Sequence, residues 1–260
     1  FENTNNGQSV LYGVCGNDCC STYIRHSYGQ FGYIQVGNNV LNKNYVNYSS
    51  ISRCMNENSN SYYMLYLYNG KICCPSVNIS LNKCYSYLGI YCYSSSASSS
   101  ITLSYSTFTD NNIFGYVCIY LGGGTNSKLE IKCCNVLRNT QSSGSWGLFY
   151  AGGNMTIDDS CIIENNAPLY FEVYSPNSIT LSNCTIDKTT KFGTYGTLII
   201  RKTVTKSFIL TLNHISTEGC HSEYTFSISP SNKKEINCSC PNNYYILRIS
   251  DFILNWVFIF

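Results

Sequence analysis

The residues Ile101-Thr-Leu103-Ser-Tyr-Ser106-Thr-Phe108 set a pattern that three later stretches repeat. The pattern is an apolar residue, any residue, a second apolar residue, two further residues, a Cys or Ser, any residue and a last apolar residue. The other copies are Leu129-Glu-Ile131-Lys-Cys-Cys134-Asn-Val136, then Met155-Thr-Ile157-Asp-Asp-Ser-Cys161-Ile-Ile163 with one residue inserted, and Ile179-Thr-Leu181-Ser-Asn-Cys184-Thr-Ile186. An internal repeat of this length indicates stacked supersecondary units.

The second apolar residue of the pattern recurs along most of the chain. We take as these anchors Ile51, Leu81, Leu103, Ile131, Ile157, Leu181 and Leu212, with weaker ones at Ile24 and Ile236. Between anchors lie short β-branched or aromatic runs, which end in turn residues such as Gly122-Gly-Gly124. Apolar residues do not recur at helical spacing over three turns. The mean anchor spacing is about 26 residues, which fits one coil of a parallel β-helix.

We therefore predict an all-β fold, a single-stranded parallel β-helix of about eight coils of roughly 26 residues each. It should cover residues 21–240, with residues 1–20 as an N-terminal cap or fragment edge. The apolar residues 241–260 are expected to be a cap, a truncated membrane anchor or an artefact, because their apolar run is shorter than a bilayer span. The chain starts at Phe1 and shows no signal peptide, so we expect a fragment or a processed form.

The 16 cysteines leave two interpretations open, secretion with disulfides or thiols buried in the fold. In the repeat register they predict an inward ladder of Cys54, Cys84, Ser106, Cys134, Cys161 and Cys184, followed by a second ladder of Phe108, Val136, Ile163 and Ile186. No pair of C-x-x-C elements has zinc spacing, and Cys15, Cys19, Cys20 and His26 fit a disulfide or cap cluster better than a metal site. We expect no metal and no other cofactor.

Charge is scarce on this chain. Charged residues make up 12% of it, and the net charge is +2 without any basic run, so nucleic acid is not an expected partner. Glycosylation sequons occur at Asn47, Asn78, Asn154, Asn183 and Asn237. Asn, Ser and Thr are so common here that chance alone would produce about as many, although the sequons would be usable in a secreted glycoprotein.

The repeat pattern Ile-x-Leu-x-Asn-Cys-x-Ile resembles that of the right-handed parallel β-helix, pectin-lyase-like superfamily over about residues 21–240. Together with the low charge and the many Asn, Ser and Cys residues, it is similar to β-helix repeats in predicted surface proteins of trichomonad-type parasitic protists. The resemblance implies a right-handed coil, an extracellular or cell-surface location and an adhesin-like role. The partner would be a glycan or a host or self surface protein, and a membrane would be reached only through a missing or truncated C-terminal anchor.

Polysaccharide lyases and glycoside hydrolases of the pectin-lyase-like fold are the alternative. Asp158 and Asp159 form the chain's one pair of adjacent Asp residues, and they are weak catalytic candidates. Gly-His-Gly is absent, and Arg201-Lys202 are adjacent instead of separated as in an Arg-x-Lys motif. Side chains of successive corner residues should diverge, whereas paired-carboxylate chemistry needs oxygens that converge at about 5–9 Å. We therefore favour a chain that is not an enzyme.

Tyrosine is the most suggestive residue type for binding. If one strand of each coil alternates inward and outward, its outward residues include Tyr68 and the binding candidates Tyr33, Tyr66, Tyr91, Tyr93, Tyr120, Tyr170 and Tyr174, and Glu172 and Arg201 are the charges on the same sheet. Such a face can bind sugar rings or proteins. The competing interpretation is that the tyrosines only stabilise the sheet by stacking.

Overall fold

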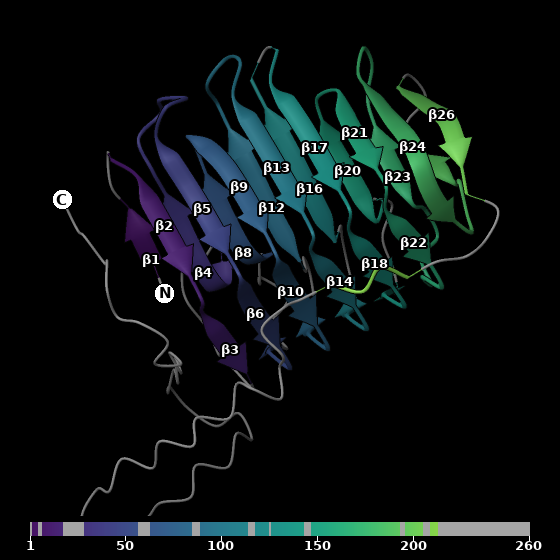
Figure 1. Cartoon of the computed structure of the whole chain (residues 1–260), viewed down its shortest axis with the longest axis horizontal. Helices are drawn as coiled ribbons and strands as arrows, with labels where there is room; N and C mark the ends of the chain where they lie inside the picture. The colour runs from purple at the N-terminus through teal and green to yellow at the C-terminus, as the bar shows by residue number, and fades with distance from the viewer. Residues whose placement is uncertain are drawn as a thin grey trace, which may run out of the picture.

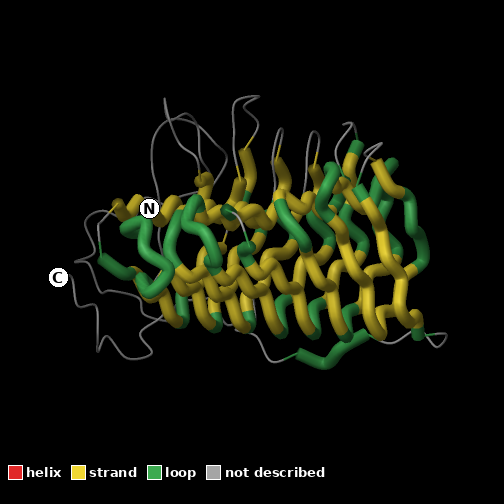
Figure 2. Tube along the Cα trace, turned by 90° about the horizontal axis from the view of Figure 1, so that it is seen from above, coloured by secondary structure: helices red, strands yellow, loops and turns green. Residues whose placement is uncertain are grey.

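The computed structural model shows an all-β parallel solenoid (Figures 1 and 2). It describes residues 2–4, 7–17, 29–56, 63–84, 89–113, 118–124, 126–142, 147–192, 196–204 and 209–212, and none of these is helical. Successive passes of the chain lie side by side, so each strand pairs with strands about one repeat away in sequence. The predicted all-β parallel solenoid is therefore confirmed.

One side of the solenoid is an eight-stranded parallel sheet. In spatial order its strands are β1 (Glu2–Thr4), β4 (Gly29–Gln35), β8 (Tyr63–Tyr68), β12 (Ile90–Ser94), β16 (Ile119–Gly123), β20 (Phe149–Gly152), β23 (Phe171–Val173) and β25 (Lys191–Phe192). We call it the tyrosine sheet, because β4, β8, β12, β16 and β20 each contain at least one tyrosine.

The other sides belong to a 14-stranded sheet that bends at β24 and so has two limbs. The first limb contains β2 (Ser9–Tyr12), β5 (Lys43–Asn47), β9 (Lys71–Pro75), β13 (Ser100–Ser104), β17 (Lys128–Lys132), β21 (Met155–Asp158) and β24 (Ser178–Ile186), with β26 (Thr197–Thr203) paired to β24. The second limb contains β22 (Cys161–Ile163), β18 (Asn135–Leu137), β14 (Thr107–Thr109), β10 (Val77–Ser80), β6 (Ser49–Ser52) and β3 (Cys15–Asn17). A four-stranded sheet of β19 (Thr140–Gln141), β15 (Asn112–Ile113), β11 (Lys83–Cys84) and β7 (Met55–Asn56) completes the described part.

The core runs along the inside of these sheets as one cluster of buried apolar side chains. Alternation along each strand selects them, since β12 buries Ile90 and Cys92 while Tyr91 and Tyr93 between and beside them stay partly exposed. Leu103, Ile131, Ile157 and Leu181 stack in register, as predicted from the repeat. Each coil buries its apolar face against its neighbours, which is the stabilising principle of a solenoid.

The corner between the two limbs has a fixed backbone form. Its residues have left-handed φ angles, for example 48° at Tyr48, 52° at Cys133 and 55° at Asn183. The N–H groups of Tyr48, Ser76, Tyr105, Cys133 and Asp159 each bond the neighbouring coil, as Cys133 N does to Asp158 O at 3.0 Å. Asn183 is suited to this position, because Asn is a residue type that tolerates the left-handed conformation.

The predicted insertion in the third repeat is wrong. Asp158 pairs with Ser182, and Cys161 pairs with Thr185, so both coils have the same corner length. Ser160 therefore takes the inward position that we assigned to Cys161, and Cys161 points outward. The inward ladder is Val14, Ser49, Val77, Ser106, Cys134, Ser160 and Cys184, all buried, and the next ladder contains Phe108, Val136, Ile162 and Ile186 with Ile162 in place of Ile163.

Cys54 and Cys84 also lie outside the predicted ladder. Cys54 is at the second corner of the coil, which links the second limb to the four-stranded sheet. Its N–H donates to Asn82 Oδ1, and Cys84 is in β11. Nine of the described cysteines occur as thiols, seven of them buried, while Cys15 is disulfide-bonded. Buried thiols thus account for most of the described cysteines, as one of the two interpretations predicted.

Two of the predicted anchors, Ile51 and Leu81, are also misplaced. Ile51 pairs with Ile79 in the second limb, and Leu81 is an exposed corner residue with φ of 58°. The residue that faces Leu103 is Cys74. The error arises because both limbs of one coil carry an apolar-x-apolar pattern, so the spacing alone cannot tell them apart.

Leu212 lies outside the strands, and Ile24, Ile236 and residues 241–260 are outside the described residues. Residues 2–17, within the expected N-terminal cap, contribute β1, β2 and β3.

Candidate functional site

A row of five tyrosines crosses five neighbouring strands of the tyrosine sheet. Tyr33, Tyr66, Tyr91, Tyr120 and Tyr150 are partners in register from β4 to β20. Each is partly exposed, because the residues on either side of it face the core. We call these five residues the tyrosine row, and of its members Tyr33, Tyr66, Tyr91 and Tyr120 were predicted from the sequence.

The rings of the tyrosine row stack on one another. Ring centroids are 4.3 Å apart for Tyr66 and Tyr91, 4.2 Å for Tyr91 and Tyr120, and 4.7 Å for Tyr120 and Tyr150, with interplanar angles of 11–13°. Tyr33 is tilted by 45° on Tyr66 at 5.2 Å. The faces of the inner rings are therefore covered by the neighbouring rings of the row. What these rings offer to a ligand is their edges and hydroxyl groups.

The hydroxyls of Tyr91, Tyr120 and Tyr150 stay protonated in neutral solution. Burial raises the pKa of Tyr120 to about 12, and it raises the pKa of Tyr91 further, with a contribution from neighbouring Tyr120 and Tyr66. Burial also raises the pKa of Tyr150. A neutral phenol both donates and accepts a hydrogen bond. The row therefore offers uncharged hydrogen-bonding groups on an aromatic surface.

A second, shorter row lies beside the first. Tyr68 and Tyr93 stack with centroids 5.6 Å apart, and in register with them follow Gly122 and Gly152. A Cβ atom at Gly122 would lie 2.8 Å from Cε1 of Tyr120 and 2.9 Å from Cδ2 of Tyr93. The rings of Tyr120 and Tyr93 therefore occupy the space that a side chain at position 122 would need, and the second row of tyrosines ends at Gly122.

The tyrosine row ends at a buried carboxyl group. Glu172 follows Tyr150 in register and is fully buried, so the prediction of an exposed charge here is wrong. Its oxygens accept hydrogen bonds from the Tyr174 hydroxyl at 2.6 Å and from Gly147 N at 3.1 Å. Burial raises the pKa of Glu172, and the hydrogen bond to it raises the pKa of Tyr174 to about 12. Tyr174 itself is 40% exposed, as expected of an outward residue.

Tyr170 is the binding candidate that the structure places differently. It is fully buried, and its hydroxyl donates to Asn165 O at 2.8 Å. Strict alternation fails here because β23 begins only at Phe171, and Tyr170 lies in the bend before it. Tyr150 was not predicted from the sequence, although its alternation with Phe149 signalled an outward position. Neither was Tyr63, which is buried with its ring centroid 4.8 Å from that of Tyr91.

The two weak catalytic candidates lie on another side of the solenoid. Asp158 is the last residue of β21, and Asp159 is at the corner with φ of 50°. Asp159 Oδ1 accepts a hydrogen bond from Asn183 Nδ2 at 2.6 Å. Neither residue is in the tyrosine sheet, so the structure does not bring the two sets of candidates together. Within the described ranges, no three His, Cys, Asp or Glu side chains are grouped so that they could hold a metal ion.

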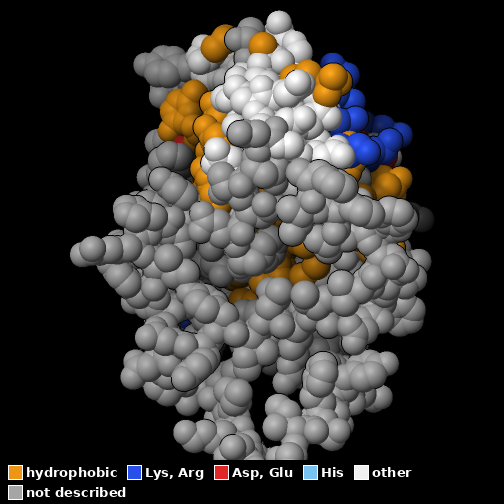
Figure 3. Space-filling model, turned by 90° about the vertical axis from the view of Figure 1, so that its left-hand side faces the viewer, with side chains coloured by type: hydrophobic (Ala, Val, Ile, Leu, Met, Phe, Trp, Pro, Cys, Tyr) orange, Lys and Arg blue, Asp and Glu red, His pale blue; other side chains and the backbone are white. Residues whose placement is uncertain are grey.

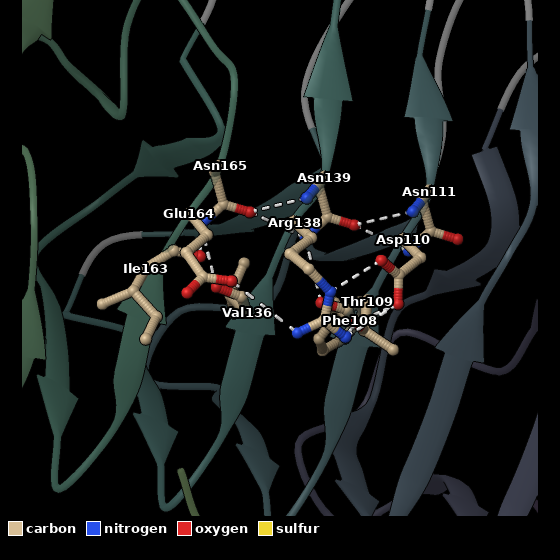
Figure 4. Close-up of polar contacts among 10 residues, drawn as sticks. All are labelled: Phe108, Thr109, Asp110, Asn111, Val136, Arg138, Asn139, Ile163, Glu164 and Asn165. Carbon is tan, nitrogen blue, oxygen red and sulfur yellow. Dashed lines mark hydrogen bonds and ion pairs between the residues drawn. The ribbon is translucent and has the colours of Figure 1, made fainter. Parts of the chain in front are cut away.

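A column of buried asparagines was not found by sequence reasoning. Asn82, Asn111, Asn139 and Asn165 stack at the second corner, and Figure 4 shows the last three. The Oδ1 atom of each of the last three accepts the main-chain and side-chain N–H groups of the asparagine before it. The available signal was the spacing of 29, 28 and 26 residues, which follows the repeat.

Charged side chains lie on the outside of this column. Arg138 makes two hydrogen bonds to the carboxylate of Asp110, at 2.8 and 2.9 Å, and lies 3.9 Å from Glu164 (Figure 4). The guanidinium group lowers the pKa of Asp110. These groups are exposed and satisfy one another, as in a solvated corner.

Figure 3 shows Lys and Arg side chains along one edge of the end that carries β1 and β2, and Lys43 and Lys71 neighbour each other at the start of β5 and β9.

Comparisons with protein-family models, with curated proteins and with solved structures found no match to this chain. Among the residues that the structure describes, no helix has the length and apolar character needed to cross a bilayer.

Proposed function

We propose that this chain is a non-catalytic β-helix repeat protein, secreted or held at a cell surface, which binds a glycan or a protein through its tyrosine sheet in an adhesin-like role. The observation that supports this best is the tyrosine row, which extends over five adjacent strands and stays partly exposed. Tyrosine is enriched at recognition surfaces because it combines apolar area with a polar end.

The geometry of the row favours recognition by hydroxyl groups and ring edges. Neighbouring strands are about 4.8 Å apart, so the row presents a hydroxyl at each such step. Stacking holds the rings in place, which lowers the entropy that a ligand must remove on binding. An extended glycan or a protein strand with repeating polar groups is the kind of ligand that matches this spacing.

The proposal includes the right-handed winding, the pectin-lyase-like relationship and about eight coils. The eight strands of the tyrosine sheet support the number of coils. An extracellular or surface location is supported by the disulfide at Cys15, since disulfides persist in oxidising compartments.

Substitution of tyrosine by phenylalanine tests the binding role. Arrays of immobilised neutral and acidic oligosaccharides, and of extracted cell-surface proteins, would first be screened with the purified wild-type chain. Tyr91→Phe/Tyr120→Phe keeps the stacked rings and removes two hydroxyls, so we expect an unchanged fold and at least tenfold weaker binding. The matched control is Tyr105→Phe, because Tyr105 is an exposed corner residue outside the tyrosine sheet. Binding that persists in Tyr91→Ala/Tyr120→Ala would refute the role of the row.

A polysaccharide lyase or glycoside hydrolase is the alternative function. It would depend on Asp158 and Asp159, whose carboxylates are partly exposed. Cleavage of a polyuronate by the wild-type chain, lost in both Asp158→Ala and Asp159→Ala, would establish that function in place of the binding role.

A further inference from the structure

The outer face of the second limb carries apolar side chains that are buried although they point away from the core. Val136 and Ile162 belong to the core, so Leu137, Cys161 and Ile163 beside them face outward. These three residues are only 4%, 0% and 9% exposed, and they form a cluster separate from the core. We call this cluster and the adjacent Asn135 the outer strip.

Residues 209–212, which come after β26 in the sequence, lie against the outer strip. Leu210 N donates to Asn135 Oδ1 at 3.1 Å, and Asn135 Nδ2 donates to Leu210 O at 2.9 Å. In Figure 1 the yellow-green trace of residues 209–212 passes β18, the strand that contains Asn135. The side-chain amide of Asn135 thus makes the two main-chain hydrogen bonds that a neighbouring strand would make.

The exposure of this segment alternates as in an extended strand. Ile209 and Thr211 are exposed, whereas Leu210 and Leu212 are partly buried. Two leucines therefore lie toward the protein, on the side where Asn135 bonds the main chain. Amide pairing with the backbone and apolar seats for alternate side chains are the two elements of recognition of an extended peptide.

We propose that the outer strip is a docking site for an extended apolar peptide and that residues 209–212 of the same chain are its resident ligand. Asn135 recognises the main chain of the peptide, and Leu137, Cys161 and Ile163 receive its apolar side chains. This surface is separate from the tyrosine sheet, and its occupant is not a glycan.

The chain length favours occupation by the chain's own segment. Val204 follows β26 and lies one strand spacing beyond Cys184, whose O accepts its N–H at 2.9 Å. Asn135 is therefore three spacings from Val204, through Thr185 and Cys161, a distance of about 14 Å. The residues between Val204 and Leu210 can span about 20 Å. A tether this short gives an effective concentration in the millimolar range, on the order of 10³ times that of a micromolar free peptide.

Asn78 provides a matched control for Asn135. It occupies the same outward row two strands away, through the pairs of Thr107 with Asn78 and with Asn135. Its Nδ2 donates to Ser50 Oγ at 3.1 Å, within the sheet. Asn78→Ala therefore removes the same side chain from the same row without removing a bond to residues 209–212.

Cys161 is a built-in reporter of the occupied strip. The full-length chain would be treated with N-ethylmaleimide, and the labelling rate of each cysteine would be measured by peptide mass spectrometry. We expect Cys161 to react at least tenfold faster in Asn135→Ala and in Leu210→Asp than in the wild type and Asn78→Ala. Cys134 and Cys184, which lie in the core, should stay protected throughout and so show that the coils are folded.

Two labelling results would overturn the proposal. In the first, Cys161 reacts as fast in the wild type as in Asn135→Ala and Leu210→Asp. In the second, Cys161 stays protected in the wild type and in both variants. If Cys134 becomes reactive in either variant, the same test is made with Asn135→Asp, which retains an acceptor for Leu210 N and loses the donor to Leu210 O.

A second experiment tests docking of a separate peptide. A fluorescein-labelled peptide with the sequence of residues 209–212 between Gly-Ser flanks is titrated with the full-length variants, and anisotropy is measured. We expect binding to Leu210→Asp at least tenfold tighter than to the wild type, and loss of that binding in Leu210→Asp/Asn135→Ala. Equal binding to all three proteins would refute the docking site. A concentration-dependent wild-type dimer that Leu210→Asp abolishes would refute occupation by the chain's own segment.

Discussion

Replacement of Asn139 by alanine should destabilise the solenoid more than any surface substitution in the same corner. Asn139 is fully buried, and its Nδ2 donates to Phe108 O at 2.9 Å and to Asn165 Oδ1 at 3.0 Å. Its Oδ1 accepts from Asn111 N at 3.2 Å and from Asn111 Nδ2 at 2.9 Å. Asn139→Ala leaves Phe108 O and Asn111 N without these partners. Each unsatisfied buried group costs about 1–3 kcal/mol, so we expect a loss of about 2–6 kcal/mol in the free energy of unfolding.

Urea unfolding, followed by circular dichroism, measures this loss, and amide exchange at Asn111 measures its local part. The matched control is Asn112→Ala, because Asn112 is the same residue type one position from the column and is exposed. It should change the free energy of unfolding by no more than about 0.5 kcal/mol. If Asn139→Ala and Asn112→Ala agree within about 1 kcal/mol, the asparagine column does not stabilise the coils as argued.

Two further predictions concern a close backbone approach and a buried acid. Gly89 has φ of 97°, and a Cβ there would lie 1.8 Å from Cys118 O. Gly89→Ala should therefore lower the melting temperature far more than Gly153→Ala, whose Cβ would lie 3.1 Å from Leu129 Cδ1. Equal melting temperatures of the two variants would contradict this. Burial raises the pKa of Glu172 above its ordinary 4.5, so its contribution to stability is complete below pH 4.5 and is lost as the pH rises through the folded-state pKa. The wild type should therefore lose stability relative to Glu172→Gln on passing upward through that window, and a difference that does not depend on pH would exclude this linkage.

The repeat predicted the parallel solenoid because the information it needs is local. Strict alternation marks the inward side of each strand, and stacking in register places Leu103 above Ile131 and Ile157. The tyrosine row follows from the same rule applied to the opposite side of the strand. Where the strand ends, the rule ends too, which is why Tyr170 in the bend before β23 turned out to be buried.

The errors in the corners have a different origin. Ser160 and Cys161 are both small enough for the inward position, so side-chain size did not choose between them. The backbone conformation decides which residue points inward. The inward residue directly follows a residue with left-handed φ, so Ser160 follows Asp159 as Cys134 follows Cys133. A repeat alignment that fixed the corner residue first would have found Ser160 without an insertion.

The asparagine column escaped notice because polar residues are ordinarily expected at the surface. Asn139 can be buried only because the coils above and below supply partners for both its donor and its acceptor. The contact of Leu210 with Asn135 spans 75 residues and lies outside the repeat. No periodicity could therefore have predicted it.

The asparagine column and the tyrosine row show that stacking of identical side chains is not itself a sign of binding. Both follow from one coil repeating above another, and the column stabilises the fold without facing solvent. The stacked rings of Tyr91 and Tyr120 contribute to stability in the same way, about 0.5–1.5 kcal/mol for an aromatic pair. A purely structural row predicts that Tyr91→Phe/Tyr120→Phe keeps any ligand binding of the wild type and loses at most the stability of the hydrogen bonds between the hydroxyls of the row. A recognition surface predicts that the melting temperature is kept while ligand binding falls, so the two hydroxyls alone separate the two roles.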